Sequence, residues 1–270
     1  MRVLLGYDGS LAANSAIEAA SVLFPTAEAS VVHLSTPPFG SKGLRARLRH
    51  SAQNVNDLIE LIDDESRQEA ERLADMGATF ARAVGWTADA VVQRTWAGEG
   101  LGLAQVADEL APDVVIVGAG GIDGAEHKMG SVSDLVVHHA TRPVLVISRH
   151  MVSREHEALR RGPVVVGVDG SAGSEAALQA ARVLFADRDV LSVAVDDGNA
   201  TVPAGTTLLQ RSRGTGATAD TVLAYAEERN AAVVAVGSRG RSALKKALLG
   251  SVAAAVLQRT FRPVLVVPKP

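Results

Sequence analysis

The chain has 270 residues, 47% of them hydrophobic, and a formal net charge of −3 at pH 7. It has no cysteine, which excludes disulfides and thiolate chemistry. No apolar run approaches the roughly 20 residues that span a bilayer, and the chain starts directly in a strand-like run with no signal peptide, so we expect a cytoplasmic protein with no membrane partner.

In the first part of the chain, short β-branched runs alternate with helical patterns, which is typical of a parallel sheet with crossover helices. The runs VVIVG and PVLVI are apolar throughout, as expected for strands covered on both faces. We expect strands at 2–7, 30–35, 90–95, 113–118 and 143–148. Helices are expected near 13–24, 54–84, 99–111 and 131–141.

The next segment, RHMVSREHEALRRG (149–162), is polar and basic, and we interpret it as a linker. A nucleic-acid-binding arm is the alternative. The chain is acidic in balance and only 3% aromatic, which disfavours that alternative, so no nucleic-acid partner is expected.

The remainder repeats the first part. VLLGYDGSLAANSAIEAASVLF (3–24) returns as VVVGVDGSAGSEAALQAARVLF (164–185), with 11 of 22 positions identical, and the segment at 130–148 returns at 250–268. Each copy is long enough to be a domain, which indicates a tandem duplication of one fold. We expect strands at 163–168, 190–195, 206–211, 232–237 and 263–267. Helices are expected near 173–185, 218–230 and 250–261.

The two copies differ in the middle. The first carries about 42 extra residues, including the acidic helix NDLIELIDDESRQEAERLADM, where the second has DDGNATVPAGT. The sequence therefore predicts one domain over 1–148, a linker over 149–162, and a shortened domain over 163–270 that lacks a middle helix. The uncovered part of its sheet could pack against the other domain or another subunit.

The copies also differ in charge. Residues 1–148 carry 11 Lys and Arg against 19 Asp and Glu, whereas residues 163–270 carry 12 against 9. An anionic ligand should therefore prefer the second copy.

The clearest candidate site follows the fourth strand of the second copy. Gly237 ends this strand, and Gly240 follows three residues later. The amides of Gly250, Ser251 and Val252 would be unpaired at a helix N-terminus, where they can bind phosphate. The alternative is that these glycines only form a turn and a cap. Positive charge surrounds the loop at Arg239, Arg241, Lys245 and Lys246.

Asp169 ends the first strand of the second copy, at the carboxyl edge where ligands bind in open α/β sheets. Its carboxylate could accept from a ribose hydroxyl or an adenine amine, or help hold a divalent cation. It could equally be a turn or helix-capping residue of the DGS motif.

These residues resemble the universal stress protein family in its tandem two-domain form. The resemblance covers essentially the whole chain, and its motif, G-x2-G-x9-G-[ST], is matched by Gly237, Gly240, Gly250 and Ser251. It implies two Rossmann-like (HUP-type) α/β domains, each with a five-stranded parallel sheet and flanking helices, paired as a pseudo-dimer through VLVIS and VLVVP. It also implies ATP, with Mg²⁺, at this loop, and contact of adenine with Val195.

The first copy shows a shortened form of the motif. The corresponding residues are Asp8, Leu34, Gly118, Gly121, Gly130, Ser131 and Val132. Only eight residues separate Gly121 from Gly130, and Asp123 and Glu126 stand where the second copy has arginines. Because acidic side chains repel a triphosphate, we expect the second site to bind nucleotide better and the first to be weaker.

We therefore predict an ATP-binding protein with a regulatory, stress-response role. A slow ATPase or phosphotransferase at the same site is one alternative, because Asp196 and Asp197 could approach a metal. A nucleotide-free dimerisation module is another. No catalytic residue and no protein-bound metal site is assigned, and His33 is expected to be a hydrogen-bonded structural residue. A monomeric pseudo-dimer and a further homodimer both remain open.

Overall fold

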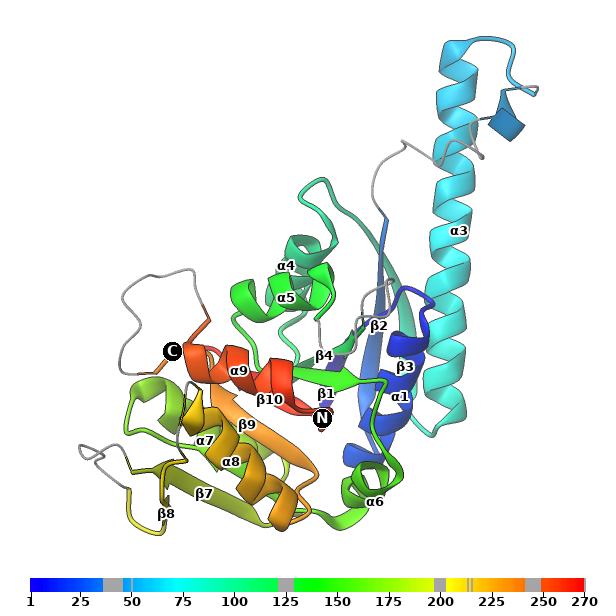
Figure 1. Cartoon of the computed structure of the whole chain (residues 1–270). Coiled ribbons are helices and arrows are strands. Elements are labelled where there is room, and N and C mark those ends of the chain that lie inside the picture. The colour runs from blue at the N-terminus through cyan, green and yellow to red at the C-terminus, as the bar shows by residue number, and fades with distance from the viewer. Residues whose placement is uncertain are drawn as a thin grey trace.

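The structure is a computed structural model that describes residues 1–35, 46–49, 51–120, 129–196, 203–212, 214, 216–240 and 249–269. Its centre is one ten-stranded sheet in the order β3-β2-β1-β4-β5-β10-β9-β6-β7-β8. From the centre of the sheet outward, the five strands of the second half therefore follow the same order as the five strands of the first half. Figure 1 shows helices on both faces of this sheet.

The first half follows the expected alternation of strands and helices. Its elements are β1 (Arg2–Gly6), α1 (Leu11–Leu23), β2 (Glu28–Ser35), α3 (Val55–Ala83), β3 (Thr87–Arg94), α4 (Glu99–Leu110), β4 (Val114–Ala119), α5 (Ser131–His139) and β5 (Val144–Ser148). The pairs β1–β2, β2–β3, β1–β4 and β4–β5 are all parallel. The predicted five-stranded parallel sheet is confirmed for this half.

The second half begins after a connecting helix. Its elements are α6 (Ser153–Arg161), β6 (Val164–Gly167), α7 (Ala172–Leu184), β7 (Val190–Val195), β8 (Thr207–Leu209), α8 (Ala217–Glu228), β9 (Val233–Gly237), α9 (Ser251–Arg259) and β10 (Val264–Val267). Its five strands are parallel to one another. No helix lies among the described residues between β7 and β8.

The two halves join where β5 and β10 pair in antiparallel orientation. Leu145 lies opposite Leu265, and both are fully buried. These two leucines occupy the same position of the repeat, 120 residues apart, so each strand pairs with its own copy. The pseudo-dimeric arrangement implied by the family resemblance is confirmed, and the joined sheet has no free edge at its centre.

Two hydrophobic layers cover the sheet, and each runs through both halves. One contains Ile17 of α1, Ala78 of α3 and Ala177 of α7. The other contains residues from α4, α5, α8 and α9, including Leu103 and Val256. Because both layers cross the junction, the two halves share their cores, and the sheet forms the middle of three layers.

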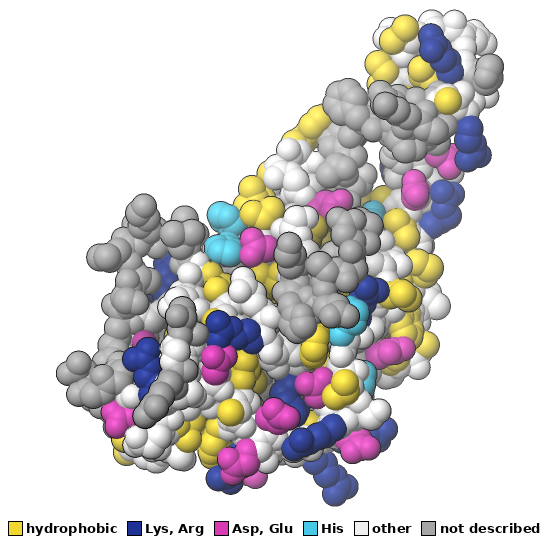
Figure 2. All heavy atoms as spheres, in the orientation of Figure 1, with side chains coloured by type: hydrophobic (Ala, Val, Ile, Leu, Met, Phe, Trp, Pro, Cys, Tyr) yellow, Lys and Arg dark blue, Asp and Glu magenta, His cyan; other side chains and the backbone are white. Residues whose placement is uncertain are grey.

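Helix α3 is the largest difference between the halves. Asn54 caps its start by accepting from the Asp57 N–H at 2.9 Å. Its buried positions lie toward its C-terminal end, where it packs on β2 and β3, and the start of the helix projects beyond the sheet as an arm (Figure 1). Acidic and basic side chains are interspersed on the arm and on the face shown in Figure 2. Among the described helices, none combines the length and the apolar character needed to cross a membrane.

In the second half, a pair of hydroxyl side chains lies at strand positions that are apolar in the first half. Ser192 of β7 forms a hydrogen bond with Thr206 at 3.1 Å, and Ser192 is only 8% exposed. The strand positions that correspond in the first half are Val31 and Ala90. The hydroxyl pair satisfies its own hydrogen-bonding groups at positions where the first half has apolar side chains.

The segment interpreted as a linker contains the nine-residue helix α6, which packs against α1 of the first half and is hydrogen-bonded to the second half. Two side-chain nitrogens of Arg188 donate to the carbonyls of Leu159 (2.7 Å) and Gly162 (3.2 Å) at the end of this helix. Arg154 donates to the Glu227 carbonyl at 2.9 Å. Ala158 and Leu159 are buried. The connection is therefore a packed element of the fold.

Candidate functional site

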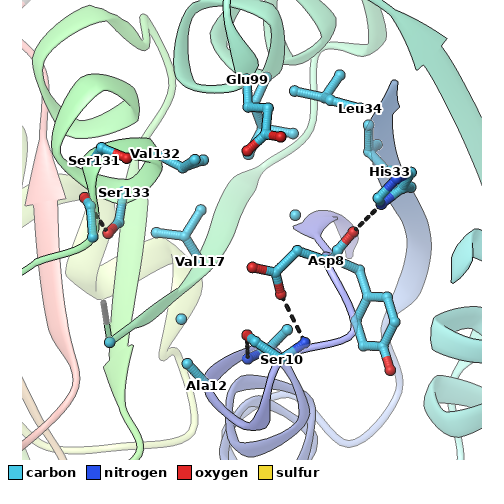
Figure 3. A pocket seen from close by; sticks show the side chains of 18 of the residues that line it. Asp8, Ser10, Ala12, His33, Leu34, Glu99, Val117, Ser131, Val132 and Ser133 are labelled. Carbon is cyan, nitrogen blue, oxygen red and sulfur yellow. Dashed lines mark hydrogen bonds between the residues drawn. The ribbon is translucent and has the colours of Figure 1, made fainter. Parts of the chain in front are cut away.

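A cavity of about 450 Å³ opens at the carboxyl ends of β1, β2 and β4 in the first half. The N-terminus of α5 and the first residue of α4 close its other sides (Figure 3). Six of the seven first-copy site residues line it: Asp8, Leu34, Gly118, Gly130, Ser131 and Val132. The seventh, Gly121, lies outside the described residues, as do Asp123 and Glu126. The sheet topology therefore brings together residues more than 120 positions apart.

The DGS motif builds the same turn in both halves. Asp8 Oδ1 accepts from the Ser10 N–H at 2.9 Å, and Gly9 adopts a φ of 77°. Ser10 then caps α1 by accepting from the Ala13 N–H at 3.2 Å. The positive φ requires glycine at the centre of the turn. Local chemistry thus fixes Asp8 at the cavity edge.

The second half repeats this turn. Asp169 Oδ1 accepts from the Ser171 N–H at 3.0 Å, and Ser171 caps α7. One carboxylate oxygen of Asp169 therefore forms the turn that the DGS motif predicted.

Gly118 and Gly237 permit a close approach of strand and helix. A Cβ on Gly118 would lie 2.5 Å from the Ala12 carbonyl oxygen, and one on Gly237 would lie 2.6 Å from the Gly173 carbonyl group. Both neighbours are backbone atoms, so only glycine fits without displacing a helix. These residues shape the site rather than simply ending a strand.

Helix α5 presents an uncapped N-terminus to the cavity. Its N-cap residue is Gly130, which has no side chain to bond the first amides. The first intrahelical bond runs from the Asp134 N–H to the Gly130 carbonyl, so the amides of the three preceding residues have no intrahelical acceptor. Such amides, with the helix dipole behind them, attract an anion.

The lining residues that were not predicted as part of the site include a histidine and a glutamate, His33 and Glu99. His33 Nδ1 lies 2.8 Å from the Tyr7 carbonyl, which confirms the expected structural hydrogen bond, yet its ring also faces the cavity (Figure 3). Glu99, the first residue of α4, directs its carboxylate into the cavity in the same view. Position at a strand end could have signalled His33, but Glu99 has no motif around it.

Tyr7 lines the inner wall of the cavity, and its hydroxyl donates to Asn14 Oδ1 at 2.8 Å. Burial, with a smaller contribution from the charge of Asp8, raises the pKa of Tyr7 above its ordinary value. The tyrosine therefore stays neutral beside the site at physiological pH.

The second half gathers its predicted residues at the equivalent edge. A Cβ on Gly240 would lie 2.7 Å from Asp169 Oδ2, so the loop after β9 passes directly over this carboxylate. The Gly250 N–H donates to the Ser238 carbonyl at 2.7 Å, so the prediction that this amide is unpaired was wrong. Helix α9 begins uncapped at Ser251. The remaining predicted residues are placed by the ends of β7 and β9 and the start of α9: Val195, Gly237 and Val252. Arg241, Lys245 and Lys246 lie outside the described residues.

One exchange distinguishes the two sites. In the first half, Gly120 lies against Ala12, since a Cβ on Gly120 would approach the Ala12 Cβ to 3.2 Å. In the second half, a Cβ on Gly173 would lie 2.3 Å from the Arg239 carbonyl oxygen. In each half, one of the two contacting residues is a glycine. The other is Ala12 in the first half and Arg239 in the second.

Within the part of the chain that the structure describes, no cluster of three or more His, Asp or Glu side chains could bind a metal ion.

Comparisons with known proteins agree with this architecture. The model of the universal stress protein family matches residues 1–148 and 199–268. A universal stress protein of Methanocaldococcus jannaschii is 40% identical over 55 residues, which cover 20% of this chain and 32% of that protein, so the match spans about a third of the relative.

Two solved structures share the fold across nearly the full chain. A universal stress protein from Archaeoglobus fulgidus superposes with a TM-score of 0.71 at 21% identity, covering 100% of this chain and 98% of that one. A functionally unknown protein from Pseudomonas aeruginosa gives a TM-score of 0.59 at 13% identity, covering 99% and 92%. With the repeated sheet and the family match over both halves, the chain belongs to the universal stress protein family.

Proposed function

We propose that this protein binds adenine nucleotides, with ATP and Mg²⁺ as the main ligand, and acts as a cytoplasmic regulator in the stress response. The observation that carries the proposal is the cavity of about 450 Å³ bounded by an Asp-ended strand, an apolar strand end and an uncapped helix N-terminus. The regulatory role and the location rest on the family alone.

The cavity offers a suitable surface for each part of a nucleotide. Leu34 and Val117 provide an apolar wall on which a base can pack. Asp8 provides a carboxylate oxygen for ribose or amine donors. Ser131 and the amides at the start of α5 provide donors for a phosphate group. This order of apolar, acidic and donor surfaces suits a ligand with a base, a sugar and an anionic end.

We propose that the second half is the stronger ATP site. It has the same turn at Asp169 and the same uncapped helix start at Ser251, and it carries Arg239 where the first half has Gly120. The second half also has the more positive charge balance. A triphosphate is therefore favoured there over the acidic first half.

Isothermal titration of nucleotide-stripped protein with Mg-ATP tests this proposal. The Gly250→Asp/Ser251→Asp variant places negative charge at the start of α9 and should remove the tighter site. The mirror variant, Gly130→Asp/Ser131→Asp, is the matched control and should leave that site intact. A far-UV spectrum and a melting curve for each variant establish that it is folded.

The same titration separates the alternatives. Loss of the tight site in the control variant instead would assign ATP to the first half. Absence of binding in the unmodified protein would favour a nucleotide-free interaction module. Multiple turnovers of bound ATP would favour a slow ATPase over a binding protein.

A further inference from the structure

We infer that Glu99 makes the first-half cavity selective for adenine ligands with one phosphate or none, such as adenosine or AMP, over ATP. The inference rests on the proposed adenine-nucleotide function and names the ligand class of one of the two sites. Its basis is the position and charge of one side chain that belongs to no recognised motif.

Glu99 is positioned by the way α4 packs. Gly98, the N-cap residue, has a φ of 85°, which turns the chain sharply into the helix. Gly100 then lies against α5, where a Cβ would be 2.4 Å from the Leu135 Cβ and 3.1 Å from the Val132 carbonyl. Glycines on both sides of Glu99 thus bring the start of α4 close to α5, which places the carboxylate over the cavity.

The carboxylate is available to a ligand. Glu99 is exposed and makes no hydrogen bond or ion pair with any residue that the structure describes. Figure 3 shows it on the opposite side of the cavity from Asp8, between Leu34 and Val132. It can accept hydrogen bonds from neutral donors, whereas it repels phosphate oxygens.

The charge balance of the first site follows from its described lining. Among the lining residues that the structure describes, Asp8 and Glu99 are the carboxylates, His33 is the histidine, and there is no Lys or Arg. Arg149 is a described cation beside this lining, and its Cδ and Nε lie 3.6 Å from the position of a Cβ on Gly120. Its Nε donates to His150 Nε2 at 3.1 Å. One cation and one helix end can compensate a single phosphate, whereas each further phosphate adds charge near two carboxylates.

The second half has no carboxylate at the position that corresponds to Glu99. Helices α4 and α8 both have 12 residues and both follow a glycine N-cap, Gly98 and Gly216. The first residue is Glu99 in one and Ala217 in the other. Together with the exchange of Gly120 for Arg239, two separate positions shift the first site toward fewer phosphates and the second toward more.

The test measures ligand preference at the first site in the full chain. Protein saturated with Mg-ATP at its tighter site is titrated with AMP and, separately, with additional ATP. The same pair of titrations is run on the Gly250→Asp/Ser251→Asp variant without added ATP. Because the two formats are independent, poor folding of the variant leaves the first format decisive.

We expect the first site to bind AMP at least about tenfold more tightly than ATP, and this preference to shrink as NaCl rises from about 50 to 500 mM because charge repulsion is screened. Glu99→Gln, which keeps size and removes charge, should reduce the preference to about threefold or less while adenosine affinity changes by less than about threefold. Glu99→Ala, which introduces the residue found at position 217, should do the same. Glu109→Gln, at the other end of α4, is the matched control and should retain the full preference.

ATP binding at the first site as tightly as AMP, with or without Mg²⁺, would overturn the inference, as would an unchanged preference in Glu99→Gln. A first site that binds no adenine ligand while the second site titrates normally would also overturn it and leave the proposed function standing. Only a failure of both sites to bind would contradict the proposed function itself.

Discussion

Phe24 and Phe185 stack on each other with their ring centroids 5.1 Å apart and their planes inclined by 28°. They are the same residue of the two repeats, 161 positions apart, and each is the C-cap of its helix, α1 or α7. The stacked pair therefore lies where the approximate symmetry of the two halves brings equivalent residues into contact. It joins their cores on one face of the sheet, as Leu145 and Leu265 do within it.

Removing either ring should destabilise both halves together. Phe24 is 4% exposed and Phe185 is fully buried, and Phe24→Ala and Phe185→Ala should each lower the free energy of unfolding by about 3–5 kcal/mol. Urea denaturation followed by circular dichroism measures this. The double variant should cost less than the sum of the two, because the rings contact each other. Strict additivity, or two separate transitions in the single variants, would show that the halves unfold independently.

Gly118→Ala should damage both stability and the first site. The added Cβ would lie 2.5 Å from the Ala12 carbonyl oxygen, so β4 and α1 must separate. We expect a loss of about 1–3 kcal/mol and weaker adenine-ligand binding in the first half.

The matched control for this variant is Gly130→Ala. The nearest atom to its added Cβ is 3.5 Å away, and the position has a φ of −64°. Replacing an N-cap glycine by alanine should cost about 0.5–1 kcal/mol at most. Equal destabilisation by the two variants would contradict the close-approach role of Gly118.

Tyr7 should make stability sensitive to alkaline pH. Its pKa is raised in the folded protein, chiefly by burial, so the folded state keeps a proton that the unfolded state releases above about pH 10. This contribution is complete below the unfolded-state pKa and is lost as pH rises through the folded-state value. Melting temperature should therefore fall above about pH 10, and less steeply in Tyr7→Phe.

At neutral pH Tyr7→Phe should cost about 0.5–1.5 kcal/mol, because Asn14 loses the hydroxyl donor at 2.8 Å. Tyr225→Phe removes a tyrosine from the other half and controls for that change. If Tyr7→Phe retains the full alkaline slope, another group causes it.

Arg188 should fix the connecting helix on the second half. It donates to the carbonyls of Leu159 and Gly162 at the end of α6. Arg188→Ala should cost about 1.5–3 kcal/mol, the range for hydrogen bonds from a charged donor. Arg188→Lys should recover only part of this, because an ammonium group lacks the planar arrangement of donors.

Hydrogen exchange of the α6 amides should rise in Arg188→Ala before exchange of the sheet amides does. Arg182→Ala, at an exposed position of α7, should change stability by less than about 0.5 kcal/mol. Unchanged α6 protection in Arg188→Ala would show that the helix is retained by its apolar contacts alone.

The sequence by itself determined the repeated unit and its local geometry. The DGS motif specifies an Asp-closed turn, a glycine with positive φ and a serine cap in both copies, because these bonds span only two or three residues. Apolar runs such as VVIVG and the helical periodicity between them predicted the parallel strands and their crossover helices, because these patterns are also local in the sequence. The pairing of β5 with β10 was expected only from the family resemblance, and its antiparallel direction was seen first in the structure.

Tertiary structure alone decided that Glu99 and His33 join the first site, and it decided the state of the connecting segment. Glu99 reaches the cavity because two glycines bring α4 against α5, and His33 because β2 ends beside β1. Segment 149–162 looks like a linker by composition, yet Arg188 and Arg154 make it a docked helix through contacts 29 and 73 residues away in sequence. Local propensity carries no information about such partners, since contacts between distant segments exist only once the whole sheet has formed.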